Sequence, residues 1–405
     1  MKRYRLHRRF HLSNCFLGGL LFTLAVTSFV FVKGTVSVCN CEDLSSNSLN
    51  LVPNSFSTSF SVLNETTSCL PKELLSTLSL SRPIDILIPW VNGSDPLWIS
   101  KRNKYQHSDE SVSANRFASH DELKFCLRSI EKFFHNYGTI YLLTDHQRPS
   151  WLNPNSPIKF ISHQDIVPKN LHELVLPTFN SQAFEAFLWN IPGISDNYLY
   201  LNDDFFFANH VDVHYFLSNN MFTLWIDEDK VLNSKHQHSN DLYKQMVYHT
   251  SELTLKKFNA RPRVDFRHLS HAPRLINKFL FKYVFDLFQD RFLEAAKTKF
   301  RATGSLVDPL SLFFHSLGTL SNMNNCSTPF VDYKLRYMSY VSLRANLEHQ
   351  RRLFEALKVV KPPFFNINDN LDSISNTNHR VTGESLKMYY DLMNLWYSEK
   401  SSFEM

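Results

Sequence analysis

The sequence predicts an α/β fold with a Rossmann-like, mostly parallel sheet flanked by helices. Short apolar runs typical of buried strands alternate with segments whose apolar residues recur at helical spacing. Acidic residues follow three of the predicted strands, at Asp95, at Asp145 and at the pair Asp203 and Asp204. Because ligands of open α/β sheets bind beyond the carboxyl ends of the strands, this pattern predicts one ligand crevice.

The predicted elements follow the order strand, helix, strand, strand, helix, strand. They are the strand Ile84–Val91, the helix Asp121–Phe134, the strands Thr139–Thr144 and Ile158–Ser162, the helix Phe184–Trp189 and the strand Tyr198–Phe207. Residues 225–262 are expected to form a polar, irregular insertion. We expect Leu275–Phe300 and Val341–Val360 to be helical, and a short extended piece to follow Pro362 and Pro363.

The strand with the sequence YLYLNDDFFF carries the strongest functional signal. An amide and two carboxylates, Asn202 to Asp204, interrupt an aromatic and apolar run. Buried carboxylates are costly unless a cation or a substrate compensates their charge. Their hard oxygens suit Mg²⁺ or Mn²⁺ and predict a site that handles phosphates. The alternative is a strand that ends in a turn, with the Asp pair capping a following helix.

The N-terminus predicts a membrane anchor. Basic residues precede the uncharged run Asn14–Val32, which would span roughly 28 Å as a helix, close to one bilayer core. Since basic flanks stay in the cytosol, residues 1–13 would form a cytosolic tail. The remainder would then be lumenal, as in a type II protein of the Golgi or ER membrane. The alternative is a cleaved signal peptide, but the run exceeds a usual h-region.

Residues 33–80 are rich in Ser, Thr, Asn and Leu and predict a lumenal stem, with the catalytic domain over residues 81–405. Asn64 begins an Asn-x-Thr sequon there and is predicted to carry a glycan. Cys39, Cys41 and Cys69 also allow a small disulfide-bearing subdomain. The net charge of +5 indicates no nucleic-acid partner, because the basic N-terminus accounts for it.

Polar residues also surround the first strand. Asp85 lies inside that strand and needs a partner if it is buried, or else faces water at an edge. The segment WVNGSD follows, and its Asn92-Gly93 step predicts a tight turn with positive φ. Further along, His268 and His271 precede a predicted helix, where a histidine can act as acid, base or phosphate ligand. Each of these features alone is more often structural.

Four blocks together resemble the Stealth family of sugar-1-phosphate transferases. That family includes bacterial capsular polysaccharide phosphotransferases, fungal xylosylphosphotransferases and the catalytic part of the animal N-acetylglucosamine-1-phosphotransferase. The first block is PIDILIPWVNGSDP, the second is long and contains YLYLNDDFFF, the third contains His271-x-Pro273, and the fourth contains NINDN. In chain order the blocks span residues 83–96, 116–207, 268–304 and 363–372.

The resemblance implies a reaction. The chain would transfer a sugar-1-phosphate from a nucleotide-sugar, expected to be a UDP-sugar, to a hydroxyl of a glycan acceptor. A phosphodiester would form and a nucleoside monophosphate would leave, so catalysis would consist mostly of positioning and charge neutralisation. Two alternatives are a metal-dependent glycosyltransferase that releases UDP and a non-catalytic glycan-binding protein.

The resemblance also implies site residues. Residues essential in the family match Asp85, Asp204, His271 and Arg301, which we expect to be catalytic. We expect substrate contacts from Trp90, Asn92, Gly93, Asp95, Arg116 and Asn202. We expect Mg²⁺ or Mn²⁺ to bind among Asp203, Asp204 and Asp369. Either His271 or Asp85 would take the acceptor proton, and the Arg301 fork would neutralise phosphoryl charge.

The sequence departs from the family pattern at Pro89, at Ala118-Ser119-His120 and at Trp189. These positions lie beside the expected sugar pocket, so the donor sugar is left open. Larger animal relatives carry protein-recognition modules between the second and third blocks, whereas this chain has only about sixty residues there. We therefore expect a glycan acceptor.

Overall fold

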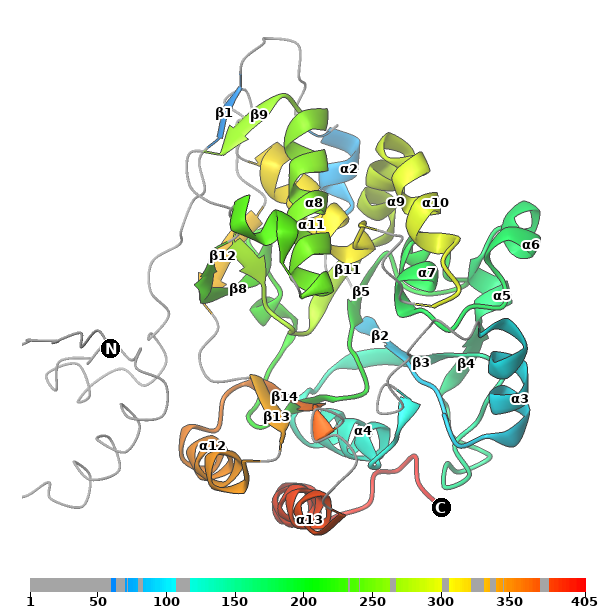
Figure 1. The fold of residues 1–405 in the computed structure, drawn as a ribbon, viewed down its shortest axis with the longest axis vertical. Helices are drawn as coiled ribbons and strands as arrows, with labels where there is room; N and C mark the ends of the chain where they lie inside the picture. The colour runs from blue at the N-terminus through cyan, green and yellow to red at the C-terminus, as the bar shows by residue number, and fades with distance from the viewer. Residues whose placement is uncertain are drawn as a thin grey trace, which may run out of the picture. The chain divides into compact units, whose positions relative to one another are not determined.

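A central sheet organises the part of the chain that the computed structural model describes (Figure 1). The model describes residues 60–62, 70, 72–78, 83–106, 117–231, 234–239, 241–262, 267–300, 306–321, 331–335, 340–344, 346–371 and 379–405. Within these residues the central sheet has the strand order β11-β5-β2-β3-β4. Its strands are β2 (Ile84–Pro89), β3 (Tyr137–Thr144), β4 (Lys159–Ser162), β5 (Asn197–Tyr200) and β11 (Arg274–Asn277).

The mostly parallel α/β sheet expected from the sequence is confirmed. β2 pairs in parallel with both β3 and β5, and β3 pairs in parallel with β4. Only the edge strand β11 among these strands is antiparallel, to β5. Ile86, Leu87 and Ile88 of β2 are completely buried. A parallel sheet covered on both faces needs such continuous apolar strands, which is why they were recognisable in the sequence.

The order of the strands creates a switch point. From β2 the chain adds β3 and then β4 on one side, and later returns to place β5 on the other side of β2. The crossovers therefore leave β2 and β5 in opposite directions, which opens a crevice at their carboxyl ends. Leu87 of β2 pairs with Tyr200, the last residue of β5, so β2 extends two residues beyond the end of β5.

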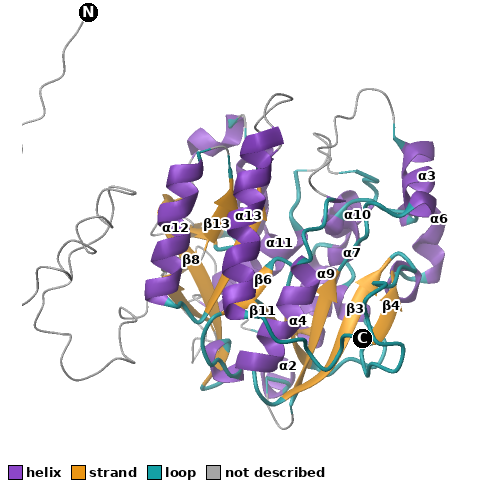
Figure 2. Ribbon diagram, turned by 90° about the horizontal axis from the view of Figure 1, so that it is seen from below, coloured by secondary structure: helices purple, strands orange, loops and turns teal. Residues whose placement is uncertain are grey.

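Helices surround this sheet (Figure 2). They are α2 (Lys72–Ser76), α3 (Pro96–Tyr105), α4 (Glu122–Phe133), α5 (His163–Ile166), α6 (His172–Val175), α7 (Ser181–Glu185), α8 (Leu242–Lys257), α9 (Lys278–Leu287), α10 (Gln289–Ala296), α11 (Pro309–Ser321), α12 (Leu347–Val360) and α13 (His379–Trp396). The predicted helix Asp121–Phe134 is confirmed as α4. It forms because Leu123, Leu127 and Ile130 recur on one face, and all three are buried.

Smaller sheets flank the central one. β13 (Tyr340–Leu343), β14 (Phe364–Asp369) and β6 (Phe205–Phe207) form one, in that order. β10 (Arg267–Leu269), β8 (Met221–Val231) and β12 (Val331–Leu335) form another, with β7 (Leu217–Ser218) also paired to β8. β1 (Phe60–Val62) and β9 (Ala260–Pro262) form a two-stranded ribbon. The extended piece expected after Pro362 and Pro363 is confirmed as β14.

Several predicted elements were wrong in extent. The run YLYLNDDFFF is two strands in different sheets, because its polar centre turns the chain out of the central sheet. Residues 225–262 are not irregular, since they contain most of β8 and the whole of α8. The segments 275–300 and 341–360 each begin as a strand before their helices, and 184–189 is only the end of α7 followed by the short 3-10 helix Leu188–Asn190. Apolar spacing alone did not separate these short strands from helix.

The end of the predicted stem belongs to the folded domain. The carbonyl of Thr77, which follows α2, accepts hydrogen bonds from the amides of Asn197 and Asn277 on β5 and β11. Leu78 is buried as well. The predicted cytosolic tail and membrane run lie outside the described residues. Within the described residues no helix is long and apolar enough to cross a bilayer.

Candidate active site

A cavity of about 780 Å³ lies at the carboxyl ends of the central strands, a size typical of small-molecule sites. Trp90 follows β2, Asp145 follows β3, and Asp203 follows β5, and all three line this cavity. The crevice predicted from acids at strand ends is therefore present. Of those acids, Asp95 is not among the described lining residues.

The turn Asn202–Asp203–Asp204 is the centre of the site. It carries the chain from β5 in the central sheet to β6 in the β13-β14-β6 sheet, and all three residues line the cavity. The Phe205 N–H donates to the Asn202 carbonyl (3.2 Å), and the Ile367 N–H donates to the Asp204 carbonyl (3.3 Å). No helix follows the turn among these described residues, so the helix-cap alternative for the Asp pair is wrong.

The carboxylates of this turn lack full compensation by the described residues around them. Burial raises the pKa of Asp203 well above its usual value, and the nearby charges of Glu122 and Asp204 raise it further. Burial also raises the pKa of Glu122, the first residue of α4, and the nearby charge of Asp204 raises it further. Oδ1 of Asp204 is buried without a hydrogen-bond partner. A site with these properties favours a compensating cation.

His271 faces this turn. Its Nε2 lies 3.4 Å from Oδ2 of Asp204 and 3.5 Å from the amide nitrogen of Asn202. Its ring packs edge-on against Phe205, with 4.6 Å between the ring centroids. The pairing of Arg274 on β11 with Tyr200 on β5 explains this placement, because residues just before β11 must lie beside residues just after β5. The structure thus brings together Asn202, Asp204 and His271 as expected.

Asp369 lines the cavity from the end of β14. Its Oδ1 accepts from the Leu371 N–H (2.8 Å), and its Oδ2 lies 3.0 Å from Nε2 of His120. The hydrogen bond to Asp369 is the main reason why the pKa of His120 is raised. The backbone N–H of His120 donates to Glu122 (2.5 Å). Sequence reasoning did not single out Glu122, although it lies in the second matched block directly before the apolar face of α4.

The predicted metal ligands line one cavity without forming a cage. In the described part of the chain, no three His, Cys, Asp or Glu side chains are arranged to hold a metal ion by themselves. Asp369 is instead oriented by His120 and Leu371. The donor chemistry nevertheless fits Mg²⁺ or Mn²⁺, since Asp204 has an unpaired buried oxygen and Asp203 needs a compensating charge. Mg²⁺ is often held by one or two carboxylates together with substrate phosphates and water.

The structure does not bring Asp85 to this cavity. Asp85 is near the amino end of β2, whereas the cavity lies beyond the carboxyl end. Its carboxylate accepts from the backbone N–H groups of Thr139 (2.7 Å) and Ser195 (2.8 Å). The missing side chain of Gly138 leaves room for this approach. Asp85 is therefore a buried carboxylate satisfied by backbone amides, neither an edge residue nor a group placed to reach a ligand here.

Of the WVNGSD segment, Trp90 lines the cavity and the remaining predicted contacts do not. Asn92 closes the turn by accepting from the Ser94 N–H (3.0 Å), and Asp95 caps α3. The hydrogen bond from Gln147 is the main reason why the pKa of Asp95 is lowered. Gly93 does not have the positive φ that the sequence predicted. A glycine is required instead because a Cβ would lie 2.1 Å from the Phe117 carbonyl oxygen.

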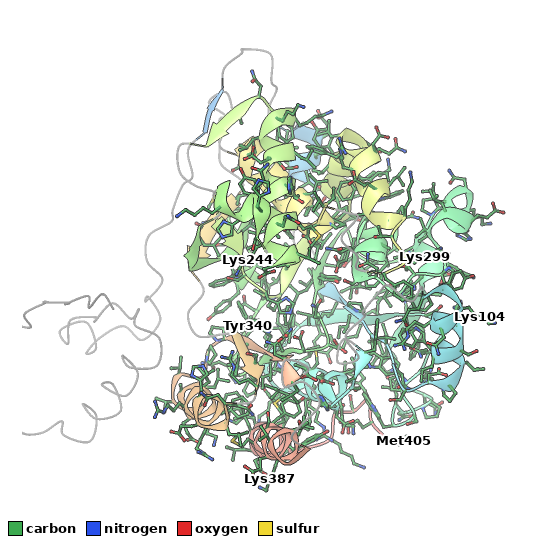
Figure 3. All side chains as sticks on the ribbon, in the orientation of Figure 1. Lys104, Lys244, Lys299, Tyr340, Lys387 and Met405 are labelled. Atoms are coloured by element: carbon green, nitrogen blue, oxygen red, sulfur yellow. The ribbon has the colours of Figure 1, made fainter. Side chains whose placement is uncertain are left out.

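Three predicted residues lie outside the described residues, namely Arg116, Arg301 and the glycosylation site Asn64. Two described cationic residues line the cavity, Arg274 at the start of β11 and Lys244 on α8. Arg274 donates to the Ser270 carbonyl (3.0 Å). Figure 3 labels Lys244 together with Tyr340, which lines the cavity from the start of β13. Sequence reasoning assigned no role to Arg274 or Lys244.

Of the positions that depart from the family pattern, some line the cavity and others are not among its described lining residues. Pro89 and Ala118 line the cavity, so they are placed to affect a bound ligand. Trp189 does not line it among the described residues, and packs instead on Phe285, with 5.3 Å between the ring centroids. Lys282 lies over the Trp189 ring.

The solved structures that align with this chain include two sugar transferases, both at TM-scores below 0.5. A galactosyltransferase LgtC aligns with 77% of this chain and 96% of its own, at 12% identity and a TM-score of 0.37. Mouse xyloside xylosyltransferase 1 aligns with 64% of this chain and 88% of its own, at 10% identity and a TM-score of 0.31.

Curated relatives have higher identity. The capsular polysaccharide phosphotransferase LcbA of Aeromonas hydrophila is 37% identical over 38% of this chain and 44% of that relative. An exopolysaccharide phosphotransferase of Streptomyces coelicolor is 31% identical over 58% of this chain and 39% of that relative. The capsular polysaccharide phosphotransferase fcs1 of Haemophilus influenzae is 26% identical over 78% and 86%. The chain thus spans less than half the length of the first two.

Two family models match the chain where the cavity is built. Conserved region 1 of Stealth proteins matches residues 82–110, which include β2 and Trp90. Conserved region 2 matches residues 116–224, which include α4 and the Asn202–Asp204 turn. Together with the phosphotransferase relatives, these matches show that the chain belongs to the Stealth family.

Proposed function

We propose that this protein transfers a sugar-1-phosphate from a nucleotide-sugar to a hydroxyl of a glycan acceptor, with release of a nucleoside monophosphate. The observation that carries the proposal is the pairing of His271 with Asp204 inside the switch-point cavity. The names of the relatives, capsular and exopolysaccharide phosphotransferases, support the same reaction class. The cavity is also large enough for a small-molecule donor.

In this reaction the acceptor oxygen attacks the β-phosphorus of the donor. A new oxygen–phosphorus bond forms while the bond from that phosphorus to the bridging oxygen breaks, and the nucleoside monophosphate leaves with the bridging oxygen. His271 would take the proton of the acceptor hydroxyl at Nε2. Asp204 would stabilise the resulting imidazolium, because its Oδ2 faces that nitrogen. The placement of Asp85 favours His271 over Asp85 as the base.

The diphosphate must be neutralised for this attack to occur. Asp203 and Asp204, with Glu122 beside them, would hold a divalent cation, which would offset the diphosphate charge when bound. Arg274 lines the same cavity and carries a planar fork suited to phosphate oxygens. Arg301 keeps the charge-neutralising role that the family resemblance implies.

The experiment that tests the proposal identifies the leaving group. The purified full-length protein in detergent is incubated with a panel of UDP- and GDP-sugars, Mn²⁺ and oligosaccharide acceptors, and the nucleotide product is separated by chromatography. We expect UMP or GMP and a sugar phosphodiester on the acceptor. Release of UDP would instead identify a glycosyltransferase. Glycan binding without nucleotide release would identify a non-catalytic binding protein.

We further propose that the chain acts in the secretory pathway, anchored by the run Asn14–Val32 with its catalytic domain in the lumen. The basic residues before that run support the orientation. Protease protection of the C-terminal part in intact microsomes tests it, and a glycan on Asn64 that is lost in Asn64→Gln would add support. Digestion of that part without detergent would contradict the proposed topology.

A further inference from the structure

One half of the cavity is aromatic and contains none of the clustered carboxylates. Trp98, Phe117 and Phe179 line it. Phe117 and Phe179 both pack on Trp98, with 4.8 Å between the ring centroids of Trp98 and Phe117 and 5.5 Å between those of Trp98 and Phe179. Trp90, Asp145 and His163 complete this half at the ends of β2, β3 and β4. The reaction described above gives none of these residues a role, although Trp90 is an expected substrate contact.

We propose that this half is a nucleoside subsite, in which Asp145 binds the ribose hydroxyls and His163 contacts the base. The inference rests on the proposed nucleotide-sugar donor. Such a donor carries its charge in the diphosphate, while its nucleoside is neutral and has a flat aromatic base. The diphosphate belongs beside Asp203 and Asp204 with their cation, so the base is left to face the aromatic side chains, where stacking is favourable.

Asp145 has the right position for the ribose. It follows β3, the neighbour of the switch-point strand β2, where doubly wound folds place an acid that bonds ribose hydroxyls. Lys101 of α3 fixes its carboxylate, with Nζ 2.8 and 2.7 Å from the two oxygens. The Asp145 side chain is only 10% exposed. Since each carboxylate oxygen accepts about two hydrogen bonds, the pairing with Lys101 leaves acceptor capacity for two hydroxyl donors.

The chemistry of His163 suits contact with the nucleobase rather than with a phosphate. Burial lowers the pKa of its imidazole to about 4, against the partly opposing charge of Asp145, so the ring is neutral at cellular pH. A neutral imidazole offers one donor and one acceptor nitrogen, which matches the mixed edge of a nucleobase. The ring is also held in place by stacking on Phe184, with 5.1 Å between centroids and 19° between planes.

The test compares UMP with 2′-deoxy-UMP by isothermal titration calorimetry on the full-length protein in detergent. The wild type should bind UMP roughly 10- to 100-fold more tightly than the deoxy analogue, because the lost hydrogen bond involves a charged acceptor. Asp145→Asn should abolish most of this preference. The matched control is Asp286→Asn, which removes a carboxylate paired with Lys282 on the exposed side of α9 and should leave the preference unchanged.

The outcomes separate this inference from the proposed function. If UMP binds and Asp145→Asn retains the full preference for ribose over deoxyribose, the assignment of Asp145 is overturned while the donor class stands. His163→Phe keeps a flat ring against Phe184 and should weaken UMP binding at least several-fold. An unchanged affinity would show that His163 does not contact the nucleobase. If no nucleoside monophosphate or nucleotide-sugar binds the wild type, the proposed function itself fails.

Discussion

Nε2 of His271 lies 3.4 Å from Oδ2 of Asp204 because two turns meet at one end of an antiparallel pair of strands. Asp204 follows β5, and His271 precedes β11, whose first residue pairs with the last residue of β5. Because β11 runs antiparallel to β5, the segment before β11, which contains His271, lies at the carboxyl end of the parallel strands. The pairing of β11 with β5 therefore positions the His271 imidazole relative to the Asp204 carboxylate.

His271→Ala should abolish turnover without loss of donor affinity. The substitution removes the proposed base, and general-base catalysis contributes roughly 10²- to 10⁴-fold to rate. Turnover is measured as nucleoside monophosphate release, and donor affinity by calorimetry. The melting temperature should stay close to that of the wild type because the ring is partly exposed. Turnover within a few-fold of normal would exclude His271 as the base.

Asp203→Asn should stabilise the cation-free protein while impairing activity. The raised pKa of Asp203 means that its ionised form is disfavoured at neutral pH, chiefly by burial and then by Glu122 and Asp204. An uncharged amide of the same size relieves this penalty, so the melting temperature in EDTA should rise. The same variant should lose part of the Mn²⁺-induced increase in melting temperature. A lower melting temperature in EDTA would show that the carboxylate is compensated within the protein.

Asp85→Asn distinguishes the structural interpretation of Asp85 from a catalytic one. Both carboxylate oxygens accept backbone N–H groups, and an amide nitrogen in place of one oxygen would face a donor. The expected cost in unfolding free energy is about 1–3 kcal/mol, the penalty of an unsatisfied buried group. Turnover per folded molecule should stay near normal. An inactive variant with unchanged stability in urea unfolding would restore the catalytic role that the family resemblance implies.

The sequence was sufficient for the parallel core and for the centre of the site. Continuous apolar runs identify β2 and β3, and the polar break in YLYLNDDFFF locates Asn202 to Asp204 in the cavity. The partition of the chain among separate sheets was not predictable, because β6 and β13 are short and depend on pairing with distant β14. The family resemblance made Asp85 a catalytic candidate, and its partners could not be anticipated because backbone amides carry no sequence signal.

Gly93→Ala should destabilise the protein although Gly93 has an unstrained backbone. A Cβ would meet the carbonyl oxygen, Cβ and carbonyl carbon of Phe117 at 2.1, 2.5 and 2.8 Å, so the backbone at Phe117 must move. Overpacking of this kind costs typically about 1–3 kcal/mol. Gly383→Ala is the matched control, because nothing lies within 4 Å of its added Cβ. Equal melting temperatures for the two variants would mean that the Phe117 loop yields freely.

His163 should make the stability of the protein depend on pH between about 6.5 and 4. Burial holds the pKa of His163 in the folded protein at about 4, below the ordinary value of 6.5 that it would have when unfolded. Below pH 6.5 the unfolded state therefore binds a proton that the folded state does not, so this contribution to stability is complete above 6.5 and is lost as the pH falls towards 4. The upper limit of the loss is roughly 3 kcal/mol, because a tenfold difference in proton affinity between the two states corresponds to about 1.4 kcal/mol.

His163→Phe removes the titrating group but keeps a ring against Phe184, so urea unfolding of this variant should be less sensitive to acid than that of the wild type over the same range. Parallel pH profiles for the two proteins would show that the folded state protonates His163 as readily as the unfolded state does.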